Sequence, residues 1–361
     1  MRDFPIAIQA GAEAYEHIQS HGLRAEDISV IASAAGGPKW FSVYGLTRFI
    51  IGSFLASTAQ RIHCIGGSVG SWQMTAACSP DPEQAIDLLR EAYATYHLDG
   101  EGTPEKMVTA CRYFIDQVLA ENQEDILHHP TRTLHIITSR GKGWLSSSVK
   151  SKQVVGFMYS YLLNAISRSG ITATADRVIF SSSSELPYAA EQDRLPTRQV
   201  VLSKENLKDA LQASGTIPFM APGVYDIPGA ETGGYWDGGL TDYHMSFPYD
   251  VDGLVIHPHF YPYVLERWYD KKVPYRSGAS HQYMSKVILI YPSASWVNSL
   301  PKGQISQMKD FHEFGDDQDG RTAYWMEISE RSLELGQALE QCLADGRIAE
   351  ITKPYSRKRR Y

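Results

Sequence analysis

Short apolar runs alternate along this chain with longer segments of helical spacing. Helix start signals at Pro38, Asp81-Pro82 and Thr103-Pro104 lie between the apolar runs, and a helix or helix pair is expected over 321–348. Strands that alternate with helices are typical of an α/β fold. We therefore expect a three-layer α/β/α sandwich with a mixed, largely parallel central sheet. The apolar runs predict its strands at 27–33, 61–65, 133–138, 177–181, 199–202, 252–257 and 286–291.

The composition limits the function classes. Of 361 residues, 43% are hydrophobic and 21% are charged, which excludes a disordered chain or a coiled coil. The formal net charge of -7 gives no general positive field, so a nucleic-acid partner is not expected. Four scattered cysteines do not make a disulfide framework, and we expect Cys64, Cys78 and Cys111 in the core.

The chain shows no sign of a secretory signal or of a membrane span. The most apolar stretch, 40–56, contains Arg48 and is short for a bilayer, so it predicts a buried helix. Gly45 and Gly52, seven residues apart, would bring that helix close to the sheet. Because no Pro-, Gly- or Ser-rich linker divides the chain, we expect one domain over 1–361, in the cytoplasm or peripheral at a membrane. The oligomeric state is left open.

The sharpest motif is the G-x-S-x-G sequence of Gly66–Gly70. It follows a predicted strand and precedes a predicted helix, which is the context that a nucleophile elbow requires. The glycines permit a sharp turn that exposes the Ser68 hydroxyl beside a helix N-terminus, where positive potential favours a developing anion. The motif predicts a nucleophilic Ser68; an idle serine in a Gly-rich turn is the alternative.

A nucleophilic serine needs donors for the oxyanion, and a glycine-rich turn upstream offers them. Gly36 and Gly37 can direct backbone N–H groups at a ligand oxygen, and Lys39 adds positive charge nearby. Pro38 has no N–H to give. The alternative is a plain strand-to-helix turn with a proline at the helix start.

The candidate base comes 169 residues after Ser68. Asp237 precedes Gly238 and Gly239, and we expect the three in a loop. The two glycines would let that loop approach the elbow closely. Taken alone, Asp-Gly-Gly is a common turn sequence.

Four segments, taken in order, resemble the family of patatin-like lipid acyl hydrolases. They are the turn 35–39, the elbow 66–70, the segment 213–222 of small residues and prolines, and the Asp-Gly-Gly sequence at 237–239. The resemblance covers about residues 27–242, and we expect 243–361 to complete or cap that unit. It implies a patatin-like fold and a Ser–Asp dyad without histidine, in which Ser68 is the nucleophile and Asp237 the base.

The resemblance also implies the roles of the surrounding residues. Gly36 and Gly37 would be the oxyanion donors. Ala35 and Trp40 stand where the family has glycines, and both would tighten the oxyanion hole or the mouth of the pocket. Hydrolysis of lipid acyl esters is the implied activity, with a phospholipid or lysophospholipid as the first guess. The supporting residues would be Lys39, Gly66, Gly70, Gly238 and Gly239.

Three alternatives stay open. An α/β-hydrolase would use a Ser–Asp–His triad, and His257, His259 and His281 all follow Asp237 in the order this needs. A lipid-binding protein on the same fold would need no chemistry at Ser68. An acyltransferase would use the same acyl-enzyme with an alcohol in place of water.

No metal or organic cofactor is expected. His128-His129 and His257-Pro-His259 have no partners at ligand spacing. The acidic turn Asp316–Gly320 does not place carboxylates at the first and twelfth positions of a calcium loop, so we expect a solvated turn there.

Two segments are candidates for contact with lipid. Aromatic and basic residues gather between Phe260 and Arg276, which suits a lipid interface or packing on the core. The apolar stretch Val154–Ile166 predicts a mobile cover over the pocket or a core helix. The expected partners are thus a lipid or other acyl-ester substrate and, peripherally, a membrane.

Overall fold

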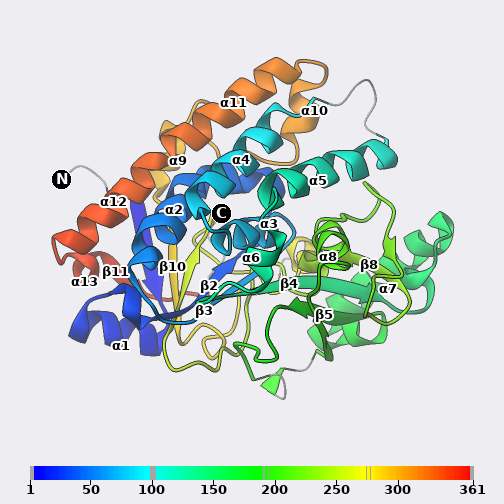
Figure 1. The fold of residues 1–361 in the computed structure, drawn as a ribbon, viewed down its shortest axis with the longest axis horizontal. Coiled ribbons are helices and arrows are strands. Elements are labelled where there is room, and N and C mark those ends of the chain that lie inside the picture. The colour runs from blue at the N-terminus through cyan, green and yellow to red at the C-terminus, as the bar shows by residue number, and fades with distance from the viewer. Residues whose placement is uncertain are drawn as a thin grey trace.

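The computed structural model describes residues 4–97, 103–189, 192–193, 195–273, 275–276 and 278–357 (Figure 1). Its centre is a mixed sheet to which eleven strands contribute among these residues. Nine of them lie side by side in the order β11 (Thr352–Pro354), β1 (Ile6–Ala10), β10 (Val287–Pro292), β9 (Leu254–Pro258), β2 (Ile28–Ser33), β3 (Ile62–Gly67), β4 (Arg132–Gly141), β5 (Ala175–Ser181) and β6 (Thr197–Val201).

The middle of the sheet is parallel and its flanks are mixed. Strands β10, β9, β2, β3 and β4 run in one direction, whereas the pairs β1/β10 and β4/β5 are antiparallel. The short strands β7 (Val224–Tyr225) and β8 (Gly234–Asp237) form an antiparallel pair, and β8 joins β4. All seven strands expected from apolar runs are present, so the α/β class and the mixed, mostly parallel sheet are confirmed.

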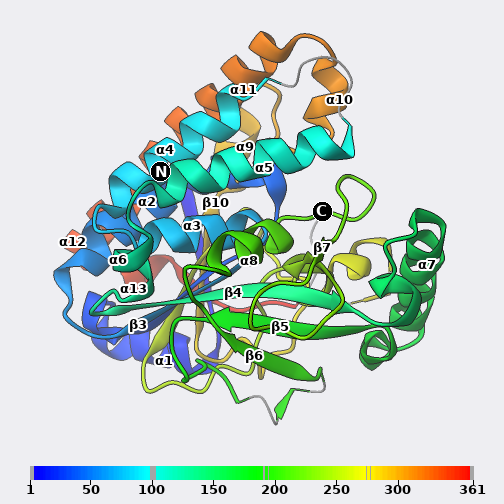
Figure 2. The same ribbon diagram turned by 45° about the vertical axis from the view of Figure 1, so that its right-hand side comes forward.

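Both faces of the sheet are covered (Figure 2). Helices supply most of the cover on one face, where Ile31 and Ile136 point into the main core. On the other face Val30 and Ile137 meet side chains from largely irregular segments, such as Phe247. The helices are α1 (Ala12–His21), α2 (Tyr44–Phe49), α3 (Val69–Ala77), α4 (Pro82–Thr95), α5 (Pro104–Leu119), α6 (Gln123–Leu127), α7 (Lys150–Ile166), α8 (Leu207–Ser214), α9 (Ala294–Ser299), α10 (Asp310–Phe314), α11 (Gln318–Arg331), α12 (Leu333–Ala344) and α13 (Ile348–Ile351).

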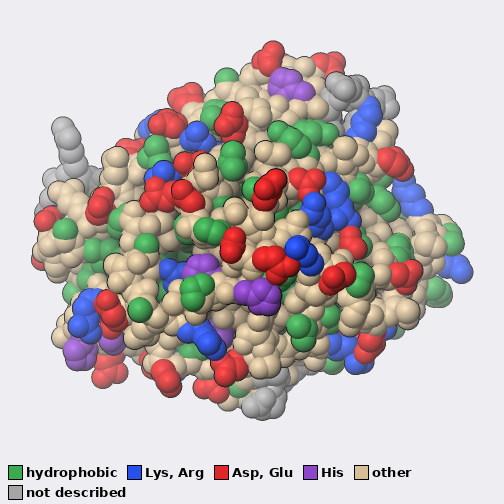
Figure 3. Space-filling model, viewed as in Figure 1, with side chains coloured by type: hydrophobic (Ala, Val, Ile, Leu, Met, Phe, Trp, Pro, Cys, Tyr) green, Lys and Arg blue, Asp and Glu red, His purple; other side chains and the backbone are tan. Residues whose placement is uncertain are grey.

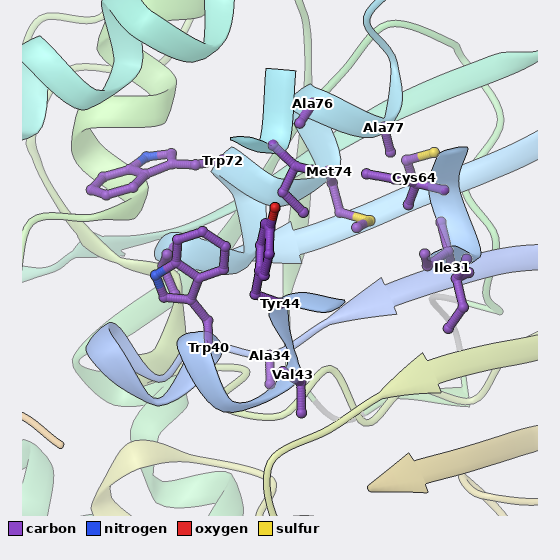
Figure 4. Close-up of a cluster of buried hydrophobic side chains, with 14 of the residues drawn as sticks. Ile31, Ala34, Trp40, Val43, Tyr44, Cys64, Trp72, Met74, Ala76 and Ala77 are labelled. Atoms are coloured by element: carbon purple, nitrogen blue, oxygen red, sulfur yellow. The ribbon is translucent and has the colours of Figure 1, made fainter. Parts of the chain in front are cut away.

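The apolar stretch after β2 is helical and largely buried, but irregular. It consists of η2 (Gly37–Val43), α2, η3 (Ile50–Phe54) and η4 (Leu55–Ser57). Figure 4 shows Trp40 and Tyr44 from this stretch near Trp72 of α3. The expectation that Gly45 faces the sheet is wrong: a Cβ there would lie 2.4 Å from the carbonyl oxygen of Ser332. The small residue therefore serves the close packing of α2 on α12 instead.

Several sequence signals for helix ends are confirmed. The Asp81 carboxylate accepts a hydrogen bond from the amide of Gln84 at 3.0 Å and starts α4. The segment 321–348 holds a helix pair, α11 and α12, as one of the two expected forms. The acidic turn before α11 is its N-cap, since Asp317 accepts from the amide of Gly320 at 2.9 Å.

All four cysteines are free and buried, as expected for Cys64, Cys78 and Cys111. Within the described part of the chain, each helix is too short or too polar to span a lipid bilayer.

Candidate active site

Ser68 occupies a strained turn between β3 and α3. Its backbone has φ 55° and ψ -136°, a conformation that residues with a side chain adopt rarely and mostly at functional sites. Close packing forces this turn: a Cβ at Gly70 would lie 2.2 Å from the carbonyl oxygen of Ser33, and one at Gly66 would lie 2.4 Å from that of Gly70. Glycine at both positions lets the start of α3 rest on β2, with Ser68 held at the bend.

Strand pairing explains why Asp237 reaches Ser68 from so far along the chain. On β4, Ile137 pairs with Gly67 at the end of β3, and the next residue, Thr138, pairs with Asp237 at the end of β8. The strand β8 thus continues where β3 turns away, and the two strand ends meet. Asp237 is the last residue of a strand, so its expected position in a loop is wrong. Gly238 and Gly239 were also expected in a loop but open the short 3₁₀ helix η8 (Gly238–Leu240), so the carboxylate has little freedom in where it points.

Gly238 has a steric reason to be glycine. A Cβ at this position would lie 2.3 Å from the carbonyl oxygen of Ile137, inside the backbone of β4. Its neighbour Gly239 donates its amide to the Asp237 carboxylate at 2.7 Å. The Asp-Gly-Gly sequence therefore holds the carboxylate in one orientation.

The segment of small residues and prolines connects the two candidate catalytic residues. Ser214 accepts a hydrogen bond from the amide of Ser68 at 2.9 Å. Two residues later, the carbonyl of Thr216 accepts one from the amide of Asp237 at 3.0 Å. One short stretch thus fixes the backbone of the serine and the backbone of the aspartate relative to each other.

Asp237 has an unusually basic carboxylate. Burial raises its pKa to about 6, because a desolvated carboxylate resists ionisation. Hydrogen bonds from the Ser68 hydroxyl and the Gly239 amide, together with the positive charge of Lys271, oppose that rise in pKa. A carboxylate of this basicity, within hydrogen-bonding reach of Ser68, is suited to take the hydroxyl proton near neutral pH.

The turn expected to form the oxyanion hole lies beside Ser68. Gly37 has φ 54°, in the left-handed region that favours glycine. The Lys39 ammonium donates to the carbonyl of Gly36 at 3.2 Å. Because the peptide is trans, this bond turns the Gly37 N–H away from Lys39. Burial lowers the pKa of Lys39 to about 8.

Ser68 lies where two cavities meet. The larger, about 410 Å³, is bordered by Gly36, Gly37, Ser68 and Asp237. Its lysines are Lys39, Lys271, Lys272 and Lys309. The smaller, about 60 Å³, is narrow and apolar, and extends from Ser68 between α3, α4 and α5. Its lining includes Trp72, Tyr93, Met107, Ala110, Cys111 and Phe114.

Sequence reasoning missed the lysines that the fold brings to Asp237. Lys271 belonged to the aromatic and basic cluster expected at a lipid interface or packed on the core, yet it lines the larger cavity with its Nζ 4.1 Å from the centre of the Tyr243 ring. Burial and the charge of Lys39 lower the pKa of Lys271 to about 6, against the pull of Asp237. The proximity of Lys271 to Asp237 arises only in the tertiary fold. The one signal in the sequence was the local gathering of basic residues.

The histidines of the alternative triad lie elsewhere. His257 and His259 are buried in the core, where Nε2 of His257 is 3.0 Å from the carbonyl oxygen of His244. Burial lowers the pKa of His257 to about 4. His281 is exposed and packs on Tyr355. None of the described residues that border the larger cavity is a histidine.

The structure also places the remaining residues that the sequence singled out for the oxyanion turn, the lipid-facing cluster and metal binding. Ala35 borders the larger cavity, but Trp40 points into the core against Tyr44, so it does not narrow the mouth of the pocket. In the segment 260–276, Tyr269 is buried while Trp268 is 39% exposed. Over the ranges that the structure describes, no three His, Cys, Asp or Glu side chains are grouped to hold a metal ion.

In comparisons with known proteins, no family model matches the chain, and neither does any curated protein. Its fold and local geometry define an α/β protein with a serine on a strand-to-helix elbow. A carboxylate held at a neighbouring strand end faces that serine. The function must therefore be argued from these residues.

Proposed function

We propose that the protein is a serine hydrolase of lipid acyl esters that works through a Ser68–Asp237 dyad. The observation that carries the proposal is geometric: Ser68 at its strained elbow and the buried Asp237 at the adjoining end of β8 border the same cavity. The raised pKa of Asp237 supports its role as the base. The order of the four motifs supports membership of the patatin-like lipid acyl hydrolases.

In the proposed first step, Ser68 Oγ attacks the ester carbonyl carbon while Asp237 takes the hydroxyl proton. The backbone N–H groups of Gly36 and Gly37 stabilise the negative oxygen, and one such donor contributes roughly 2.7–4 kcal/mol. The bond between the carbonyl carbon and the leaving oxygen then breaks. Asp237 returns its proton to the leaving alcohol, and an acyl-enzyme remains on Ser68.

In the second step, water attacks the acyl-enzyme and gives its proton to Asp237. The bond from the carbonyl carbon to Ser68 Oγ breaks, and Asp237 passes the proton back to that oxygen. The carboxylic acid leaves, and the dyad is restored. An acyltransferase would differ only in accepting an alcohol in place of water.

The two cavities support the choice of substrate. The narrow apolar pocket beside Ser68 suits an acyl chain, whose burial is favourable by about 0.8 kcal/mol per CH₂. In the larger cavity Lys39, Lys272 and Lys309 outnumber the carboxylate of Asp237, which favours a leaving group that carries negative charge. Lys271, with its pKa of about 6, adds little charge at neutral pH. A phospholipid or lysophospholipid combines both features.

A serine-directed fluorophosphonate probe tests the dyad. We expect the probe to label Ser68, identified by peptide mass spectrometry, and expect Ser68→Ala and Asp237→Asn each to abolish ester hydrolysis in a folded protein. Activity that survives Asp237→Asn would rule the dyad out. If ester hydrolysis were lost in His257→Ala or His259→Ala instead, a Ser–Asp–His triad would replace the dyad as the catalytic arrangement. A lipid-binding protein would keep its ligand affinity and show no turnover at all.

A further inference from the structure

The helix α7 presents its apolar side to solvent. Val155, Met158, Leu162 and Ile166 are 48, 59, 55 and 84% exposed. Their spacing of three and four residues places them on one face. The opposite face is buried and carries the polar residues Ser160 and Asn164. This is the reverse of the usual pattern of a surface helix, which turns its apolar side inward.

One buried and one exposed hydrogen bond fix this orientation. The amide of Asn164 donates to the Asp270 carboxylate at 2.9 Å. The hydroxyl of Tyr161 donates to the carbonyl of Lys272 at 3.2 Å. A rotation that turned the apolar face inward would break both bonds and separate the buried amide of Asn164 from its partner. The outward apolar face is therefore a property of the native packing.

The helix α7 packs against two segments that border the larger cavity. The residues that Tyr161 contacts belong to η9 (Trp268–Lys272), and Trp268, Lys271 and Lys272 border that cavity. Phe157 of α7 packs on Phe219 with ring centroids 5.0 Å apart. Phe219 is 52% exposed and lies between Pro218 and Met220, which also border the cavity.

The stretch of sequence that contains α7 carries no acidic residue. The chain has net charge -7, yet it contains no Asp or Glu between Asp125 and Asp176. Lys150 and Lys152 are exposed at the start of α7. Figure 3 shows hydrophobic and basic side chains side by side at the edge of the molecule where Figure 1 places α7.

We propose that this surface docks the protein on a membrane that contains anionic lipid. The docking surface consists of Val155, Met158, Tyr159, Leu162 and Ile166 of α7, with Lys150, Lys152, Trp144, Phe219 and Trp268 around them. An amphipathic helix buries its apolar face in the interfacial region, tryptophan favours that region, and lysines bind anionic headgroups. Charge favours lipid over a second copy, because a symmetric dimer would bring two positive faces together.

Docking in this way would place the mouth of the cavity at the lipid surface. Lipid could then pass from the bilayer to Ser68 without crossing bulk water. The proposal goes beyond the chemistry at Ser68, since a protein without turnover would bind the membrane equally well.

A single fluorescent label tests the contact directly. All four natural cysteines are buried, so Met158→Cys introduces an exposed site for a nitrobenzoxadiazole dye. We expect its emission to rise and shift to the blue with vesicles of phosphatidylcholine and phosphatidylserine. The matched control is Val201→Cys, also exposed but on β6, whose dye should not respond. An unchanged Met158→Cys signal, or an equal response from both labels, would overturn the proposal.

Vesicle flotation measures how much the apolar residues and the lysines of the docking surface each contribute to membrane binding. The double variant Met158→Glu/Leu162→Glu should lose vesicle binding, whereas Val201→Glu should keep it. The double variant Lys150→Glu/Lys152→Glu should bind anionic vesicles at least roughly 20-fold more weakly, about fivefold for each lysine. Lys353→Glu, an exposed lysine on β11, should leave vesicle binding unchanged.

Two further measurements separate this proposal from the others. Vesicle binding by Ser68→Ala should match that of the unaltered protein, so a failure of the dyad would not disturb it. All surface variants should cleave a water-soluble ester normally if they are folded. Should sedimentation reveal a dimer that Met158→Glu/Leu162→Glu dissociates, the surface joins two copies and the membrane proposal is wrong.

Discussion

The hydroxyl of Ser214 accepts a hydrogen bond from the amide of Ser68 and donates one to the carbonyl of Ile137, over 2.9 and 2.7 Å. It thereby ties the elbow to β4, the strand that also pairs with the end of β8. Ser214→Ala should leave two buried backbone groups unpaired, at a cost of about 1–3 kcal/mol in unfolding free energy. We also expect kcat to fall on the order of tenfold, because a small misplacement of the nucleophile is costly.

Urea unfolding and the turnover of a water-soluble ester check these two effects. Ser329→Ala is the matched control, since Ser329 is also fully buried but bonds within α11, away from the cavities. It should lower stability without a specific loss of kcat. If Ser214→Ala kept full turnover per folded molecule, Ser214 would not position Ser68.

Asp237 should make the folded protein less stable when it is ionised. Its folded pKa of about 6 exceeds the ordinary value of 3.8 for an exposed aspartate, so the folded state holds a proton that the unfolded state has lost between those pH values. Stability therefore falls as pH rises through that window. Asp237→Asn removes this effect and should raise the unfolding free energy above pH 6 by up to about 3 kcal/mol.

Thermal unfolding at pH 4 and at pH 8 tests whether ionisation of Asp237 lowers the stability of the folded protein. Asp237→Asn should be more stable than the unaltered protein at pH 8, and the gap should close at pH 4. Asp250→Asn, which alters an exposed carboxylate, should change stability little at either pH. An equal difference in stability between the two proteins at both pH values would mean that ionisation of Asp237 does not cause the difference.

The acid side of the pH profile of kcat/KM should show the influence of Lys271 on the pKa of Asp237. Because Asp237 must be ionised to act as a base, kcat/KM should fall as pH drops below about 6. The charge of Lys271 lowers the pKa of Asp237, so Lys271→Met should move the midpoint of that fall to higher pH. Lys309→Met is the control: Lys309 borders the same cavity but is paired with Glu313 at 2.8 Å, and the midpoint should stay in place. A shift to lower pH would contradict the assignment.

Local patterns predicted the elbow and seven of the eleven strands in the described residues, because each of these depends on a few adjacent residues; β1, β7, β8 and β11 were not predicted. The apolar run of β3 is itself sufficient to predict a strand, and Gly66 and Gly70 permit the turn at Ser68. The strand that carries Asp237 was missed. It is four residues long and exists through its pairing with β4 and with β7, which lies ten residues upstream.

Tertiary placement also decided which side of a helix or loop faces water. The apolar spacing within α7 predicts a buried face, and the structure buries Asn164 instead because Asp270 lies opposite. Lys271 looked like a surface residue by type, and the fold places it at Asp237. Both outcomes depend on contacts between segments about a hundred and about thirty residues apart, which no local pattern encodes.

Chain-length preference should follow from the narrow apolar pocket beside Ser68. Ala110 of α5 borders that pocket, and Ala110→Leu would fill much of its roughly 60 Å³. We expect kcat/KM for a long-chain ester to fall at least tenfold, while kcat/KM for the acetyl ester of the same alcohol changes little. Thr109→Leu, on the exposed side of α5, adds similar bulk outside the pocket and should preserve the preference. If Ala110→Leu lowered both values equally in a protein of unchanged melting temperature, the acyl chain must bind elsewhere.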